Sequence, residues 1–201
     1  MILTKPQLRK TMRQLVGAMT TAERAAADAS ICKHLSGFIK KNCPGLLLAF
    51  FPSGHEPDIR PVISEAQSTA RRVALPVSTP DAMSFRQFCG RERLCAGPWA
   101  IAEPDAVCPA VGAEEMSSAA LLLVPGLAFT RGGERLGRGG GHYDRFLAFY
   151  PDVCSVGVCY GVQVVEQLPA EQWDRAVRWL CTEQGVVRAA DGISGQAAGG
   201  V

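Results

Sequence analysis

Residues 119–146 read AALLLVPGLAFTRGGERLGRGGGHYDRF, and this stretch decides the fold. Its first six residues, 119–124, are all apolar, which is typical of a short strand buried on both faces. Pro125 and Gly126 end that strand, and a long glycine-rich loop then leads to residues 143–150, where the sequence predicts a helix. A strand of this kind followed by a helix indicates an α/β fold with a parallel sheet.

The rest of the chain extends this pattern. Thr4 with Gln7, and Thr20 with Glu23, have the spacing of a capping box, and each pair begins a stretch with helical apolar spacing. Further strands are predicted at residues 46–51, 72–77, 83–88, 155–160 and 177–181, and further helices at residues 59–70 and 162–167. We therefore expect an α/β fold with an open, largely parallel sheet and helices on both faces, a Rossmann-like layered sandwich.

Length and composition fit one compact domain. The chain has 201 residues, of which 47% are hydrophobic and 20% charged, which is enough to bury one continuous core. We expect a single domain over residues 1–184. Residues 185–201 are rich in Gly and Ala, which predicts a disordered tail, and residues 78–116 read as largely irregular.

Charge and cysteine usage argue against several classes of protein. A formal net charge of +2 gives no field that would favour nucleic acid or an anionic membrane as a partner. No signal peptide or bilayer-spanning stretch is evident, so we expect a cytoplasmic protein, with a monomer as the default. The eight cysteines are scattered without a Cys-x-x-Cys pair, which favours core thiols over disulfides or zinc.

The loop after residue 124 is the segment with the clearest chemistry. Ligands of open α/β sheets gather beyond the carboxyl ends of strands. Glycines let the backbone approach a ligand, and arginines followed by a helix N-terminus favour an anion. The loop residues of these types are Gly132, Gly133, Gly137, Gly139, Gly140, Gly141, Arg131, Arg135, Arg138 and Arg145. The pattern predicts a phosphate site, although it is neither a P-loop nor a dinucleotide fingerprint, which His142 interrupts.

Two plainer interpretations stay open at this stage. A flexible surface loop would also carry glycines and be kept solvated by its arginines. Asp144 lies immediately beyond the loop, where a carboxylate can hold Mg²⁺ together with phosphate oxygens. An Asp in the first turn of a helix also serves as a cap, without any metal.

Several segments closely resemble those of the 5-formyltetrahydrofolate cyclo-ligase family, also called methenyltetrahydrofolate synthetases. The segments that carry the resemblance are LVPGLAF (123–129), RLGRGGGHYDRFL (135–147), KPQLR (5–9), FFPSGHEPD (50–58), RVALP (72–76), IAEP (101–104), LPAEQWD (168–174) and CTEQGVV (181–187). Together they cover nearly the whole chain except the tail. The resemblance implies an ATP- and Mg²⁺-dependent ligase that converts 5-formyltetrahydrofolate to 5,10-methenyltetrahydrofolate, ADP and phosphate.

In that family the formyl oxygen takes the γ-phosphoryl group, a neighbouring folate nitrogen closes the ring, and phosphate leaves. The substrate supplies its own nucleophiles, so the protein has to position the reactants and stabilise charge. The resemblance therefore implies no Ser-His-Asp triad in this chain.

The resemblance also assigns roles to residues on the nucleotide side. Lys5 and Arg9 match a basic pair that reaches the nucleotide phosphates. The glycine-loop part of the nucleotide site would consist of Arg135, Leu136, Gly137, Arg138, Gly139, Gly140, Gly141, His142 and Tyr143. Asp144 matches a magnesium ligand, and we expect Arg138 and Asp144 to be the catalytic residues.

On the folate side, Phe51 matches an apolar wall and Glu56 a polar anchor for the pterin, and Trp99 is a candidate stacking surface. Each has a plain alternative outside the resemblance. Lys5 and Arg9 have the i, i+4 spacing of a solvated helix stripe. Glu56 alone would be an ordinary loop carboxylate, and Trp99 a core or rim side chain.

Two positions depart from the family pattern. His142 stands where many members have tyrosine, and an imidazole titrates near neutral pH. Many members have a second acidic metal ligand where this chain has Arg178, with Asp174 four residues earlier as a possible substitute. Mg²⁺ held by Asp144 with water and phosphate oxygens is chemically reasonable.

Two other functions stay open beside the ligase. One is a relative that binds nucleotide and folate without turnover. The other is an RNA-binding element, since loops rich in arginine and glycine can follow a phosphate backbone. The absence of a wider basic patch in the sequence argues against RNA.

Overall fold

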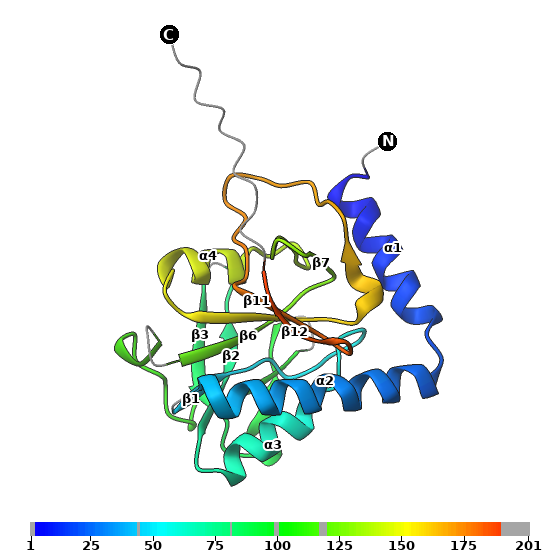
Figure 1. Cartoon of the computed structure of the whole chain (residues 1–201). Helices are drawn as coiled ribbons and strands as arrows, with labels where there is room; N and C mark the ends of the chain where they lie inside the picture. Colours follow the sequence, from blue (N-terminus) through cyan, green and yellow to red (C-terminus); the bar gives the residue numbers. More distant parts are fainter. Residues whose placement is uncertain (1–2, 44, 81, 99–100, 117–119, 190–201) are drawn as a thin grey trace.

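The computed structural model describes residues 3–43, 45–80, 82–98, 101–116 and 120–189. Its centre is a seven-stranded sheet with the strand order β12-β11-β9-β6-β1-β2-β3 (Figure 1). These strands are β1 (Leu46–Leu48), β2 (Arg72–Ser78), β3 (Met83–Gln87), β6 (Ala120–Pro125), β9 (Cys154–Val158), β11 (Trp179–Thr182) and β12 (Gly185–Arg188). The five inner strands are parallel, and β3 and β12 pair antiparallel at the edges. The predicted α/β class with a largely parallel sheet is confirmed.

Helices cover both faces of this sheet (Figure 1). They are α1 (Lys5–Ala18), α2 (Thr21–Asn42), α3 (Arg60–Ser68) and α4 (His142–Phe149). On one face, α2 and α3 pack against Leu47 and Leu121. On the other, α4 packs against Leu48 and Leu122. Successive strand residues point to opposite faces, so each apolar run contributes to both cores.

Helix α1 packs against a small second sheet. This sheet has the order β10-β7-β8, with β7 at Ala128–Thr130, β8 at Arg135–Leu136 and β10 at Val164–Val165. Leu8 and Met12 of α1 form a third apolar cluster with Leu127 and Leu136. The cluster fixes the first turns of α1 beside the glycine-rich segment, which is how residues near the chain start come close to residue 137.

Both predicted capping boxes are present. The Thr4 amide donates to Gln7 Oε1 at 2.9 Å, and the Thr20 amide donates to Glu23 Oε2 at 2.8 Å. In the second box, the Glu23 amide also donates to Thr20 Oγ1 at 3.2 Å. The helix starts could be predicted because they depend on contacts between residues three apart.

Three sequence predictions need correction. The segment predicted as an open loop contains the β7–β8 hairpin, because the buried ring of Phe129 fits where Gly126 and Gly157 leave room for it. Instead of a helix over residues 162–167, the chain forms a short 3-10 helix, η4 (Gly161–Gln163), and then β10. The tail predicted from residue 185 begins too early, because β12 pairs with β11 as the edge strand of the sheet. Residues 190–201 lie outside the described residues.

The segment predicted as irregular, residues 78–116, has local structure of its own. It holds β3 and a hairpin of β4 (Leu94–Ala96) and β5 (Ala102–Pro104), with 3-10 helices η1 (Arg91–Arg93) and η3 (Glu114–Met116). All eight cysteines are free thiols, and Cys43, Cys108, Cys159 and Cys181 are buried. Within the described ranges, no helix has the length and apolar character needed to cross a membrane.

Candidate active site

A cavity of 580 Å³ opens at the carboxyl ends of β1, β2 and β6. Phe50 and Phe51 follow β1, Pro76 and Ser78 lie near the end of β2, and Pro125 ends β6. This is where open α/β sheets bind ligands, because loops diverge from the strand ends there. The glycine-rich segment after β8 and the start of α1 form other walls.

All of the predicted site residues that the structure describes line this one cavity. They are Lys5, Arg9, Phe51, Glu56, Arg135, Leu136, Gly137, Arg138, Gly139, Gly140, Gly141, His142, Tyr143 and Asp144. Trp99 lies outside the described residues. Three distant parts of the chain are thus brought together, and the roles of the individual residues remain predictions.

The ion pair between Arg135 and Asp144 anchors the glycine-rich wall. Arg135 Nη2 donates to Asp144 Oδ2 at 2.8 Å, and the Arg135 side chain is only 4% exposed. The guanidinium also lies 5.6 Å from the ring centre of Tyr143, and burial raises the pKa of that tyrosine. Arg135 Nε is buried without a hydrogen-bond partner in the described structure. This wall of the cavity therefore holds a buried guanidinium that is paired with one carboxylate and has one N–H without a partner.

The backbone of the loop requires glycine at several points. Gly139 and Gly141 have φ angles of 115° and 66°, in the region that side chains rarely adopt. A Cβ atom on Gly137 would lie 2.5 Å from Arg135 Nη1, so that guanidinium needs the space. Arg9 Nε donates to the Gly137 carbonyl at 2.9 Å and fixes the loop to α1. The loop then enters α4, whose N-terminus favours an anion.

Lys5 joins the start of α1 to the segment that follows β10. Its Nζ donates to Glu171 Oε2 at 2.7 Å and to Asp174 Oδ2 at 2.8 Å. Burial works to lower the pKa of Lys5, but the hydrogen bonds to Asp174 and Glu171 outweigh it and raise the pKa overall. Lys5 is therefore a permanent cation at the rim of the cavity.

Glu56 is held by Arg138 across the cavity. Arg138 Nη2 donates to Glu56 Oε1 at 2.8 Å and to Ser53 Oγ at 2.8 Å. The Ser53 amide donates to the other Glu56 oxygen at 2.9 Å. Burial nevertheless raises the pKa of Glu56 above the usual value for a glutamate. In this structure Arg138 therefore joins the glycine loop, predicted to bind nucleotide, to Glu56, predicted to bind folate.

The sequence analysis did not predict the buried acid Glu103, which lines the cavity together with Phe51, Met83 and Ile101. Glu103 is 5% exposed, and its Oε1 accepts a hydrogen bond from the Ser78 amide at 3.0 Å. Burial raises its pKa. The IAEP stretch was the only sequence signal for it, because a lone Glu in an irregular segment reads as solvated. Glu171 and Trp173 also line the cavity and were likewise not predicted as site residues.

Asp144, Glu171 and Asp174 are carboxylates that line the cavity near Lys5 and Arg135, and the sequence singled out Asp144 and Asp174 as candidate metal ligands. Asp144 Oδ1 accepts the Arg175 amide at 3.2 Å, and both aspartates line the cavity. Within the described part of the chain, no group of three or more His, Cys, Asp or Glu side chains could hold a metal alone. Mg²⁺ suits this donor set, since it takes one or two carboxylates and completes its shell with phosphate and water.

Arg178, which replaces an acidic residue of the family pattern, does not lie in the candidate metal site. It donates from Nη2 to the Pro151 carbonyl at 2.8 Å and is not among the residues that line the cavity. Asp174, which the sequence suggested as a substitute ligand, does line it. The departure at residue 178 therefore places no positive charge in the candidate site.

A cavity at the carboxyl ends of parallel strands, walled by a glycine- and arginine-rich loop, defines the class as an α/β protein with a candidate anion-binding site. Comparison with known proteins gives the family: the 5-formyltetrahydrofolate cyclo-ligase family matches residues 2–183. The chain belongs to this family of enzymes.

Individual relatives agree with that assignment. The 5-formyltetrahydrofolate cyclo-ligase of Mycolicibacterium smegmatis is 31% identical over 92% of this chain and 96% of its own length. The NMR structure of 5,10-methenyltetrahydrofolate synthetase from Aquifex aeolicus has a TM-score of 0.80 and 30% identity, over 96% of each chain. The synthetase structure from Mycoplasma pneumoniae, at 21% identity and a TM-score of 0.73, covers 90% of this chain and 99% of its own, and supports the fold.

Proposed function

We propose that this chain converts 5-formyltetrahydrofolate and ATP to 5,10-methenyltetrahydrofolate, ADP and phosphate, with Mg²⁺ bound beside the nucleotide. The observation that carries the proposal is the distribution of charged and apolar side chains around this cavity. Among the lining residues, Arg9 binds the glycine loop and Lys5 binds the β10–β11 connection, whereas Phe51 follows β1 and the buried Glu103 binds Ser78 at the end of β2. Such a site suits a polyphosphate that meets a flat heterocycle rich in N–H groups.

The proposed chemistry needs no nucleophile from the protein. The formyl oxygen attacks the γ-phosphorus, and the bond from that phosphorus to the bridging oxygen of ADP breaks. The neighbouring folate nitrogen then attacks the activated formyl carbon and loses its proton, and the carbon–oxygen bond breaks to release phosphate. The protein has to align the two substrates and stabilise the charge on the transferred group.

The positions of the cationic residues support this proposal. Arg138 extends from the glycine loop to Glu56, so its guanidinium can stabilise charge as it develops between the two substrates. Lys5 and Arg9 lie on one face of α1 and are suited to the remaining phosphates. Asp144 would hold the metal, with Asp174 nearby. Neutralising charge on the phosphoryl oxygens is the chemistry that Mg²⁺ supplies when bound.

The part of the cavity that we propose for folate offers side chains for both its rings and its N–H groups. Phe51, Met83 and Ile101 provide apolar surface for the ring system, and Glu56 and Glu103 are acceptors for its N–H donors. Glu56 is occupied by Arg138 in this structure. The hydrogen bonds of Arg138 to Ser53 and Glu56 use Nη2, so its other N–H groups can serve the phosphate while Nη2 keeps Glu56 in place beside folate.

The test compares two arginines of one loop. Arg138→Ala should lower kcat by about 10²–10³, since it removes a donor that acts on developing charge. Arg131→Ala is the matched control, because Arg131 is exposed and does not line the cavity, and its kcat should stay within about twofold. Equal effects of the two substitutions would contradict the role of Arg138. A folded wild-type protein that binds ATP and forms no product would be a binding relative without turnover.

A further inference from the structure

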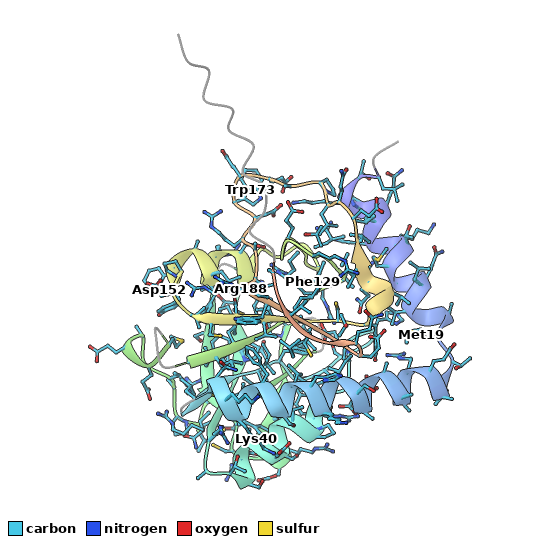
Figure 2. All side chains as sticks on the ribbon, viewed as in Figure 1. Met19, Lys40, Phe129, Asp152, Trp173 and Arg188 are labelled. Atoms are coloured by element: carbon cyan, nitrogen blue, oxygen red, sulfur yellow. The ribbon has the colours of Figure 1, made fainter. Side chains whose placement is uncertain are left out.

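The connection from β10 to β11 carries Trp173, which lines the cavity together with Glu171 and Asp174. Figure 2 shows this residue at the top of the molecule, on the segment that leads away from the first turn of α1. Lys5 ties the segment down through Glu171 and Asp174. The Glu171 amide also donates to Asp174 Oδ2 at 2.8 Å, which closes a tight turn around the tryptophan.

The indole of Trp173 is exposed and yet held in place. The residue is 57% exposed, which is high for so large an apolar ring. Its Nε1–H donates to Glu171 Oε2 at 3.0 Å, and the same oxygen accepts from Lys5 Nζ at 2.7 Å. The ring is therefore anchored through its polar edge while its apolar surface remains available at the cavity rim.

The direction of the nucleotide follows from the two ends of the cavity. The γ-phosphoryl group has to face the folate side, near Arg138 and Glu56. The rest of the nucleotide must then extend away from Phe51 and Met83, past the glycine loop. Lys5, Glu171 and Trp173 line the cavity at the rim on that cationic side. The base, which is the flat and least polar part of ATP, comes last along this path.

We infer that Trp173 stacks on the adenine ring and is a binding residue for the base, an assignment that rests on the proposed function. Stacking on an aromatic side chain needs only a flat π-surface, and a fixed indole loses little conformational entropy when a base binds. Lys5 then has a second role: it positions Trp173 through Glu171 as well as contributing positive charge.

A comparison of two ligands distinguishes binding of the base from binding of the phosphates. We would measure the dissociation constants of ATP and of inorganic tripolyphosphate, both with Mg²⁺, by calorimetry for wild-type protein, Trp173→Leu and Trp173→Phe. Trp173→Leu should weaken ATP binding by roughly 10-fold or more, and Trp173→Phe should restore most of it, because phenylalanine keeps an aromatic face. Tripolyphosphate has no base, so its affinity should be the same in all three proteins.

Tryptophan fluorescence provides an independent readout. ATP should quench the wild-type emission more than tripolyphosphate does, and Trp173→Phe should lose this difference. Unchanged melting temperatures would show that the variants fold. Equal ATP affinity in wild type and Trp173→Leu would overturn the inference alone, as would an equal loss for both ligands. If the wild-type protein binds no ATP, the proposed function and the inference both fail.

Discussion

At the scale of single residues, the cavity contains two buried glutamates whose surroundings differ. Glu56 is paired with Arg138, whereas Glu103 accepts from the Ser78 amide. Burial is the largest influence on both and raises both pKa values. A carboxylate kept in such a place costs stability in the absence of ligand, which is common for groups that serve binding.

We predict that Glu103→Gln stabilises the ligand-free protein at neutral pH. The pKa of Glu103 is higher in the folded than in the unfolded state. The protonated Glu103 side chain therefore adds to the free energy of unfolding fully below the unfolded pKa, and this contribution is lost as pH rises through the folded pKa. The amide never ionises and still accepts from Ser78. The melting temperature should rise by about 2–4 °C at pH 7.5, which is about 1 kcal/mol in a chain of this size, and the gain should vanish near pH 4.

Thermal melts at the two pH values check this prediction. Glu166→Gln is the control, because Glu166 is exposed, and its melting temperature should follow the wild type at both. A Glu103 variant that is less stable than wild type at neutral pH would mean that the ionised carboxylate has a stabilising partner.

At the scale of elements, local contacts decided what the sequence could predict. The starts of α1 and α2 were predicted because Thr4 and Thr20 each have their partner three residues along the chain. The β7–β8 hairpin was missed because it depends on Phe129 lying against Gly157, which comes from another strand. Strand β10 has only two residues, Val164–Val165, and its pairing with β7 leaves no periodic pattern in the sequence.

The hairpin itself gives an element-scale prediction, for Gly133→Ala. Gly133 has a φ of 85°, and a Cβ atom there would overlap the carbonyl oxygen of Val177. We expect a loss of about 2–4 kcal/mol in the free energy of unfolding from the strained backbone and the overlap. Urea unfolding measures it.

Gly37→Ala is the matched control in α2. Gly37 lies inside the helix, and a Cβ atom there would meet nothing within 4 Å. The same substitution should therefore stabilise the protein by about 0.5–1 kcal/mol through helix propensity. A gain in stability at both glycines would show that the fold around Gly133 differs from the one described.

At the scale of the whole molecule, the sequence predicted which chain segments carry the site but not how the cavity is completed. The loop that holds Glu56 comes to the cavity from the end of β1 in the parallel sheet. Lys5 joins it because α1 packs against the small second sheet, beside the segment that leads to Asp144. Glu103 and Trp173 were not predicted as site residues, because their places depend on contacts between distant residues. Glu103 is held by Ser78, and Trp173 is held through Glu171, which Lys5 binds from the start of α1. The predicted tail boundary failed for the same reason, since β12 depends on its pairing with β11.

The extent of the domain can be tested by two truncations. A chain that ends at Gln184 loses β12, whose Val186 packs against the main core and whose backbone pairs with β11. A chain that ends at Ala189 keeps both features. We expect the shorter chain to be less stable than the longer one by about 3 kcal/mol in urea unfolding, from lost burial and ladder hydrogen bonds. Equal stabilities would mean that the domain ends before residue 185.

The most direct test of the central claim is the near-ultraviolet absorbance of the purified protein mixed with 5-formyltetrahydrofolate, ATP and Mg²⁺. We predict growth of the methenyl band, with one ADP formed for each product and no growth when ATP is omitted. Asp144→Asn should lower the rate sharply and raise the Mg²⁺ requirement, since the amide is a weaker metal ligand. A folded wild-type protein that binds ATP but gives no methenyl band would contradict the proposed activity.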